Sequence, residues 1–189
     1  IVAVTEDAPY VVVTREGDAD AALPFGPFDP AGDRTLELSL RRWVSEQTGF
    51  DIGYVEQLYT FGDRGREAPL RDIETTPDRL ISISYLALTP TRAPLDRAQA
   101  RWRSWYEFFP WEDWRAGRPA VLLDVIQPAL ATWICDACPT ATDDVASRRE
   151  RVAIAFGLDG GRRDDERVLD RLDILVESGL QDGAVDRHM

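Results

Sequence analysis

The sequence contains no lysine and a single histidine, His188, beside its last residue. Without lysine it has no phosphate-binding Gly-x-x-x-x-Gly-Lys loop, because that motif uses its lysine to reach the phosphates. With one near-terminal histidine, neither a Ser-His-Asp nor a Cys-His arrangement can be assembled for nucleophilic catalysis. These absences exclude several common hydrolase and nucleotide-binding templates.

Cysteine is also scarce, since Cys135 and Cys138 are the only two and form one C-x-x-C. Such a pair could be half of a zinc site or a redox pair. Zinc would need two further ligands. A thioredoxin-like pair opens a helix after a strand, whereas this one follows an apolar helical run. We therefore interpret it as two thiols near a helix end.

No apolar run is long enough to span a bilayer, and no basic segment precedes an apolar one as in a secretory signal. We expect a cytoplasmic protein. Arginine numbers 22 against 34 Asp and Glu, giving a formal net charge of −12. Because such a surface repels phosphate backbones, we expect little or no binding of duplex DNA by this chain. With 189 residues and 44% hydrophobic residues, the chain is long enough for a compact domain with a helical appendage.

The hydrophobic pattern predicts an α+β layered fold. A hairpin is expected over Ile1–Glu6 and Tyr10–Arg15, and a Pro/Gly loop follows. The next helix begins after Asp33 or Thr35 and stops at Thr48-Gly49. The remaining predicted elements are strands over Ile52–Phe61, Leu80–Leu88 and Arg101–Phe109, a helix from Val121 kinked at Pro128, and helices over Asp143–Phe156 and Asp164–Ser178.

The segment from Arg42 to Phe50 resembles the end of the Nudix box, Arg-Glu-aliphatic-x-Glu-Glu-x-Gly-aliphatic. Trp43 and Gln47 stand where that family carries metal-binding glutamates, and Glu46 is the one that remains. Positions 43, 46 and 47 share one helix face. The resemblance therefore implies that a cluster of three carboxylates, suited to Mg²⁺, has been reduced to one.

Upstream, Leu23-Pro24-Phe25-Gly26 resembles the Leu-Pro-Gly-Gly entry of the same family. Counting back from Arg42, Phe28 falls on the box glycine and Arg34 on the box glutamate. An arginine on the first turn of the helix is unfavourable for the helix dipole unless it contacts an anionic ligand. The alternative is that Arg34 is an ordinary surface residue.

A second resemblance narrows the family. The segments Glu56–Asp63 and Ile81–Leu88 resemble those of a Nudix subgroup that comprises bacterial transcriptional regulators of NAD metabolism and related ADP-ribose pyrophosphatases. The segment Trp102–Trp114 resembles that of alphaproteobacterial NAD regulators, which carry a degenerate Nudix domain before a DNA-binding winged helix. This implies a Nudix fold, a mixed sheet between helices, over residues 1–138. Residues 139–189 would be a helical extension leading to a winged-helix region missing from this chain.

The resemblance also implies a function. The domain would sense ADP-ribose or a related nucleotide diphosphate without cleaving it, would form a homodimer, and would contact DNA only through the missing C-terminal region. No cofactor is expected. The candidate ligand-binding residues are Phe25, Phe28, Arg34, Phe61, Arg64 and Arg66; Arg42 and Glu46 are catalytic remnants, with Glu46 at most a weak metal ligand.

Three alternatives stay open. The chain could be an active, Mg²⁺-dependent hydrolase that uses Glu46 with Glu37 or Glu107. It could instead be a protein–protein module that kept the fold for its surfaces. Whatever the function, the tryptophans could stack on a base or pack in a core or interface. A further possibility is that Phe25, Phe28 and Trp43 fill the former substrate cleft.

Overall fold

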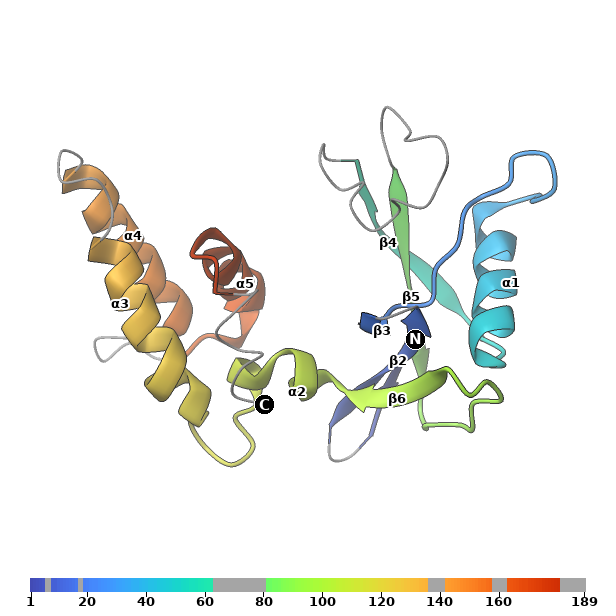
Figure 1. Ribbon diagram of the computed structural model, residues 1–189, viewed down its shortest axis with the longest axis horizontal. Coiled ribbons are helices and arrows are strands. Elements are labelled where there is room, and N and C mark those ends of the chain that lie inside the picture. Colours follow the sequence, from blue (N-terminus) through green and yellow to red (C-terminus); the bar gives the residue numbers. More distant parts are fainter. Residues whose placement is uncertain (6–7, 17–18, 63–80, 136–141, 158–162, 181–189) are drawn as a thin grey trace. The chain divides into compact units, whose positions relative to one another are not determined.

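The computed structural model describes the chain except for residues 6–7, 17–18, 63–80, 136–141, 158–162 and 181–189. The chain divides into two compact units, Ile1–Phe108 and Phe109–Met189. Figure 1 labels their helices and strands. The first is called the sheet unit and the second the helical unit.

The sheet unit is built on one six-stranded sheet with the order β3-β2-β1-β5-β4, and β6 also pairs with β2. Because β1 is antiparallel to β2 and parallel to β5, the sheet is mixed. The predicted hairpin and the α+β class are therefore confirmed. The elements are β1 Val2–Val4, β2 Pro9–Glu16, β3 Ala19–Ala22, α1 Leu36–Thr48, β4 Val55–Phe61, β5 Ser82–Thr89, β6 Ala100–Ser104 and α2 Trp105–Phe108.

Helix α1 has the two ends that its sequence predicts. The Thr35 hydroxyl accepts a hydrogen bond from the Leu38 backbone N–H at 3.2 Å, which satisfies one of the free donors of the first turn. At the other end Gly49 adopts the left-handed conformation, with φ of 69°, and its N–H donates to the Ser45 carbonyl at 2.9 Å. Of the two caps considered, Thr35 is the one used.

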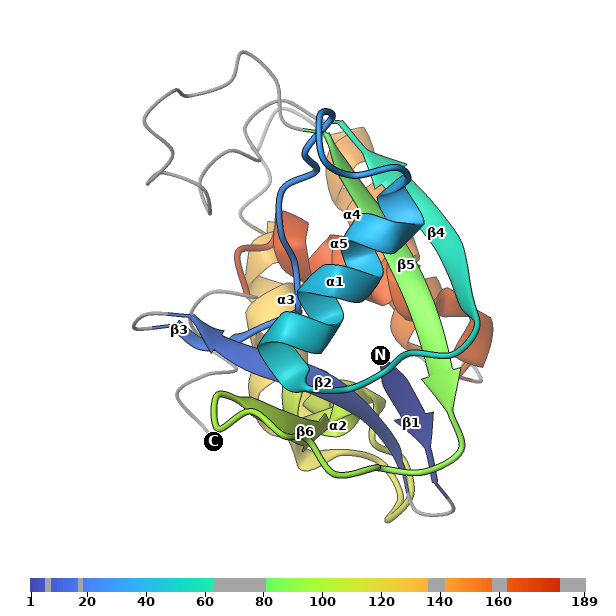
Figure 2. The same ribbon diagram turned by 90° about the vertical axis from the view of Figure 1, so that its right-hand side faces the viewer.

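One face of the sheet is covered by α1, which Figure 2 shows lying in front of the strands. Val44 of α1 packs with Ile52 and with Ala87 of β5 in a small buried core. At the border of this core the ring of Phe50 meets Trp102 edge-on, with centroids 6.1 Å apart. These contacts turn Val44 toward the sheet. Trp43 and Gln47 lie on the flank of α1, where they meet the preceding loop.

The predicted strand over Arg101–Phe109 is wrong in its second half. The strand β6 ends at Ser104, and α2 begins at Trp105. The Ser104 hydroxyl accepts from the Tyr106 N–H at 3.3 Å, and the Glu107 carboxylate accepts from the Ser104 N–H at 2.9 Å. This reciprocal Ser-x-x-Glu capping box starts the helix. The short strand β3 was not predicted at all.

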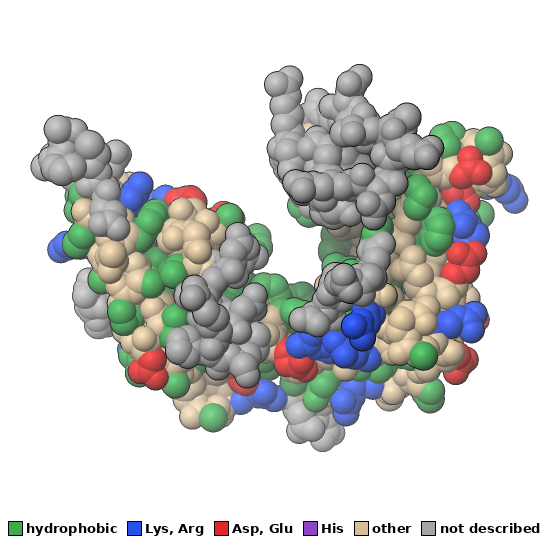
Figure 3. Space-filling model, viewed as in Figure 1, with side chains coloured by type: hydrophobic (Ala, Val, Ile, Leu, Met, Phe, Trp, Pro, Cys, Tyr) green, Lys and Arg blue, Asp and Glu red, His purple; other side chains and the backbone are tan. Residues whose placement is uncertain are grey.

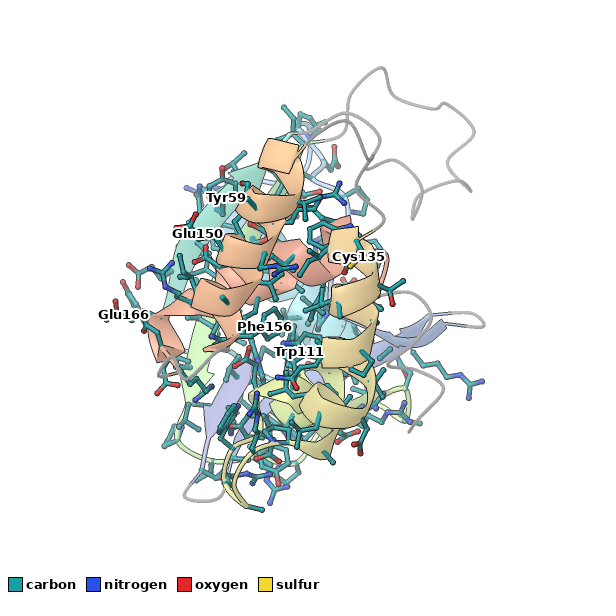
Figure 4. All side chains as sticks on the ribbon, turned by 90° about the vertical axis from the view of Figure 1, so that its left-hand side faces the viewer. Tyr59, Trp111, Cys135, Glu150, Phe156 and Glu166 are labelled. Carbon is teal, nitrogen blue, oxygen red and sulfur yellow. The ribbon has the colours of Figure 1, made fainter. Side chains whose placement is uncertain are left out.

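The helical unit buries a separate core centred on Ile126, Leu130, Ile174 and Leu175. Figure 4 labels Trp111 and Phe156, which belong to this core. Its elements are η2 Pro110–Glu112, η3 Leu122–Ile126, α3 Gln127–Cys135, α4 Thr142–Phe156, η4 Asp165–Arg167 and α5 Val168–Glu177.

The irregularity expected at Pro128 takes the form of a π-helical turn. The segment η3 is π-helix, and the N–H of Gln127 bonds to the carbonyl of Leu122, five residues earlier. Pro128 has no N–H to continue the ordinary ladder, so a wider turn before it is a local solution. The two later helices are confirmed, although the second begins with the 3₁₀ turn η4.

The boundary between the two units lies between Phe108 and Phe109, whereas the prediction from the sequence placed it between residues 138 and 139. The physical reason lies in α3, whose Leu130 and Ile134 are buried with residues of α4 and α5. The apolar helix after Val121 therefore belongs with the C-terminal helices. None of the helices in the described part of the chain combines the length and the apolar character needed to cross a membrane.

Candidate functional site

The loop before α1 is fastened to the helix face that carries positions 43 and 47. The indole Nε1 of Trp43 donates to the Pro27 carbonyl at 2.9 Å. The Gln47 side-chain amide bonds the backbone of Phe25 twice, accepting from its N–H at 3.2 Å and donating to its carbonyl at 2.5 Å. The side chains of Trp43 and Gln47 thus bind the backbone of Phe25 and Pro27.

Gly26 permits this approach. A β-carbon at this residue would lie 2.1 Å from the Cδ2 and Cε2 atoms of Trp43, closer than any real contact. At residue 26 the loop backbone therefore lies directly against the indole. We call residues 25–27 together with Trp43 and Gln47 the loop anchor.

A second attachment joins the end of the same loop to α1. The Nη2 atom of Arg42 lies 3.0 and 3.1 Å from the two carboxylate oxygens of Asp33. Asp33 also accepts the Asp29 N–H at 2.9 Å. This backbone hydrogen bond, followed by one from Ser39 and by Arg42, holds the pKa of the Asp33 carboxyl below its usual value. The Arg42 guanidinium lies over the Trp43 ring, 4.5 Å from its centroid.

Within the part of the chain that the structure describes, Glu46 is not a member of a carboxylate cluster. Its side chain is exposed and forms a long ion pair with Arg42, with 3.9 Å between Oε1 and Nη1. Among the described residues no group of three or more His, Cys, Asp or Glu side chains is arranged to hold a metal ion. Figure 3 shows acidic and basic side chains mixed along the α1 side of the sheet unit.

The two other carboxylates considered as metal ligands are engaged elsewhere. Glu37 pairs with Arg41, one turn later on α1, at 2.8 Å. Glu107 pairs with Arg103 at 2.7 Å and accepts the Ser104 N–H. Partial burial opposes ionisation of Glu107, but these two hydrogen bonds outweigh it and lower its pKa. Each carboxylate already has a local structural partner.

The predicted ligand-binding residues are only partly brought together. Phe25 and Phe28 lie on the anchored loop and are 39% and 42% exposed. Arg34 is exposed and precedes the Thr35 cap, which corrects its predicted place on the first helical turn. Phe61 ends β4, where its ring contacts Tyr59 at 4.8 Å. Arg64 and Arg66 lie outside the described residues.

Sequence reasoning missed the role of Asp33, which it considered only as a helix cap. It also treated Trp43 and Gln47 as losses, without a partner for either. A signal for the anchor exists in the pairing of a glycine-containing loop with a large side chain on the next helix. That signal does not say which loop residue the side chain meets.

The solved structures to which this chain is similar include two of a single protein. The NUDIX domain of Shewanella oneidensis NrtR, solved in complex with ADP-ribose, is 21% identical over 58% of this chain and 72% of that chain, with a TM-score of 0.47. The structure of Shewanella oneidensis NrtR is 18% identical over 72% of this chain and 61% of its own, with a TM-score of 0.41. No family model matches the chain, and no curated protein sequence matches it either.

Proposed function

We propose that the sheet unit is a Nudix-like domain that binds a nucleotide diphosphate of the ADP-ribose type and does not hydrolyse it. The observation that carries this proposal is the loop anchor: the side chains of Trp43 and Gln47 hold the backbone of Phe25 and Pro27. A helix face occupied by a loop cannot present three carboxylates to Mg²⁺, which demands near-octahedral oxygen ligands. Hydrolysis by the Nudix route would lack its metal and its activated water.

An active hydrolase is the second candidate function, and the same contacts argue against it. Glu46 is the one box carboxylate left. Glu37 and Glu107, the possible replacements, are hydrogen-bonded to Arg41 and to Arg103. Recruiting either would break a charge-assisted pair before a metal could be bound.

The ligand class comes from the motif resemblance, and ADP-ribose is also the ligand named for the NrtR NUDIX domain. With positions 43 and 47 occupied, the phosphates would be held beyond β4, where the chain continues from Phe61 to Arg64 and Arg66. Two arginines can each form bidentate bonds with phosphate oxygens, which lysine cannot. Arg34 remains available, since its side chain is exposed.

The wider role is part of the same proposal. The chain would belong to a cytoplasmic, homodimeric regulator of NAD metabolism, and ligand binding would bias the geometry of the dimer. The attached DNA-binding region would lie in the C-terminal direction. This counts as allostery only if the ligand distinguishes two states of the protein.

A thermal-shift and turnover screen tests the proposal. The full chain is incubated with ADP-ribose, NAD and AMP, each with and without Mg²⁺ or Mn²⁺. Stabilisation by ADP-ribose without release of AMP is expected. AMP formation that Glu46→Gln abolishes would establish the hydrolase, and the absence of both effects would leave a protein–protein module.

Calorimetry then locates the phosphates. Arg64→Ala and Arg66→Ala are titrated with ADP-ribose beside Arg118→Ala, an exposed arginine of the helical unit. Losing one charge-assisted contact costs about 1.5–3 kcal/mol, which is roughly tenfold to a hundredfold in affinity. If both loop variants match the parent within about twofold, the phosphates are bound elsewhere.

A further inference from the structure

The loop before α1 combines a restricted backbone with an exposed aromatic residue. Three prolines, at positions 24, 27 and 30, each restrict one backbone angle. The Gln47 side-chain amide binds both the N–H and the carbonyl of Phe25, and the Trp43 indole binds the carbonyl of Pro27. Phe25 itself is 39% exposed. Gln47 therefore holds the backbone of an aromatic residue that solvent can reach.

The loop lies at the end of the sheet unit where α1 begins and β4 ends, as Figures 1 and 2 both show. In the proposed function the phosphates of the nucleotide are held at this end, because the chain continues there from Phe61 toward Arg64 and Arg66. A base attached to those phosphates would be bound at the same end of the unit. Phe25 is an exposed aromatic residue of a loop at this end.

Holding such a loop in place before a ligand arrives increases affinity. If only a fraction of the molecules has the loop in its binding conformation, the apparent affinity falls by that fraction. Fixing the conformation beforehand removes this cost. The two bonds from Gln47 to Phe25 are at the surface, where water competes with them, so each shifts the equilibrium of the loop only modestly. Together they restrain both backbone groups of one residue.

We propose that Gln47 is a positioning residue for nucleotide binding: it holds Phe25 so that the ring stacks on the base, and it does not touch the ligand itself. The inference rests on the proposed function, from which it takes the ligand class. An aromatic ring stacks on the flat face of a base without selecting its sequence of polar groups. Position 47 then serves nucleotide binding without a metal.

The test measures the affinity of the full chain for ADP-ribose by calorimetry. Gln47→Met keeps the length of the side chain and loses both bonds to Phe25. Gln99→Met makes the same change at an exposed position before β6 and is the matched control. One hydrogen bond shifts an equilibrium about fivefold, so Gln47→Met is expected to weaken binding about tenfold or more. Gln99→Met is expected to leave the affinity unchanged.

A second background separates positioning from a general loss of structure. Phe25→Leu keeps an apolar side chain and removes the ring, and it should weaken binding about tenfold. In this background Gln47→Met should cost little further affinity, because a positioning residue acts through the ring that it holds. A residue that only supports the fold would weaken binding equally in both backgrounds. Thermal unfolding without ligand checks that each variant is folded.

The possible results separate this inference from the proposed function. Weakening by Gln47→Met that disappears in the Phe25→Leu background supports the inference. Binding by the parent that Gln47→Met leaves unchanged, or weakens equally in both backgrounds, would overturn the inference and leave the proposed function intact. No binding of ADP-ribose by the parent would overturn both.

Discussion

The backbone of Gly26 lies against the indole of Trp43 so closely that a β-carbon at residue 26 would stand 2.1 Å from two ring carbons. The indole Nε1 also donates to the next carbonyl, that of Pro27, at 2.9 Å. The glycine in the loop and the tryptophan on the helix therefore form one packed contact. The tryptophan at position 43 and the glycine at position 26 therefore have to be considered together.

Gly26→Ala is expected to destabilise the sheet unit, because its methyl group must displace the Trp43 ring. Overpacking of this kind costs about 1–3 kcal/mol. The free energy of unfolding is measured in urea, with tryptophan fluorescence as the signal. Gly53→Ala is the matched control, since a β-carbon there meets nothing within 4 Å; it should leave the stability nearly unchanged.

A double-mutant cycle shows whether the two residues act on one another. In a Trp43→Ala background the Gly26→Ala substitution should cost little, so the two effects should be non-additive by about 1 kcal/mol or more. Equal cost of Gly26→Ala in both backgrounds would mean that the loop does not rest on the indole.

Local rules predicted the parts of the fold that depend on a few neighbouring residues. Thr35 and Gly49 end α1 as expected, because capping needs only the first and last turns. The Ser104–Glu107 capping box was equally local, but an aromatic run suggested a strand and concealed it. In that case the signal was present in the sequence and the aromatic composition outweighed it in the interpretation.

The candidate site depended on contacts between residues that are far apart in the sequence. The Gln47 side chain meets Phe25 22 residues away, and the Trp43 indole meets Pro27 16 residues away. The positions of the Nudix pattern could be counted along the sequence, so the resemblance alone predicts that two of its three carboxylates are absent here. The contacts of Trp43 and Gln47 could not be predicted in this way. A motif specifies which residues are expected at a position, but it does not specify which backbone groups a different residue at that position will bind.

Placing carboxylates at positions 43 and 47 of α1 is expected to create a metal-binding site. In the Trp43→Glu/Gln47→Glu variant, positions 43, 46 and 47 would carry three carboxylates on one helix face. Mn²⁺ binding, followed by calorimetry or by the paramagnetic effect on solvent water, should appear in the variant and be weak in the parent. Adding Glu46→Gln should reduce it again. A variant that binds Mn²⁺ no better than the parent would show that α1 does not present these positions together.

Stability should depend on Asp33 in a defined pH range. The folded structure lowers the pKa of its carboxyl, chiefly through the Asp29 N–H and then through Ser39 and Arg42. The ionised form is thus favoured by folding. Its contribution is present above the unfolded pKa of about 3.9 and is lost as the pH falls through the lower folded pKa. Asp33→Asn should therefore lower the melting temperature at pH 7, and the difference from the parent should shrink as the pH falls below about 4. A difference that persists unchanged at low pH would contradict this assignment.

The last prediction concerns the ion pair inside the helical unit. Nε and Nη2 of Arg171 donate to the two carboxylate oxygens of Glu112 at 2.6 and 2.9 Å, and both side chains are buried. Arg163 adds a third donor at 2.9 Å. Glu112→Gln leaves a buried guanidinium without its counter-charge, and breaking a buried pair in this way costs about 3–5 kcal/mol.

Glu177→Gln is the control. It removes the carboxylate from an exposed ion pair with Arg151 that has comparable geometry and is worth about 0–1 kcal/mol. Urea unfolding of the full chain should separate the two variants clearly. Similar losses in both would mean that water reaches Arg171 and that the pair is not part of the dry core.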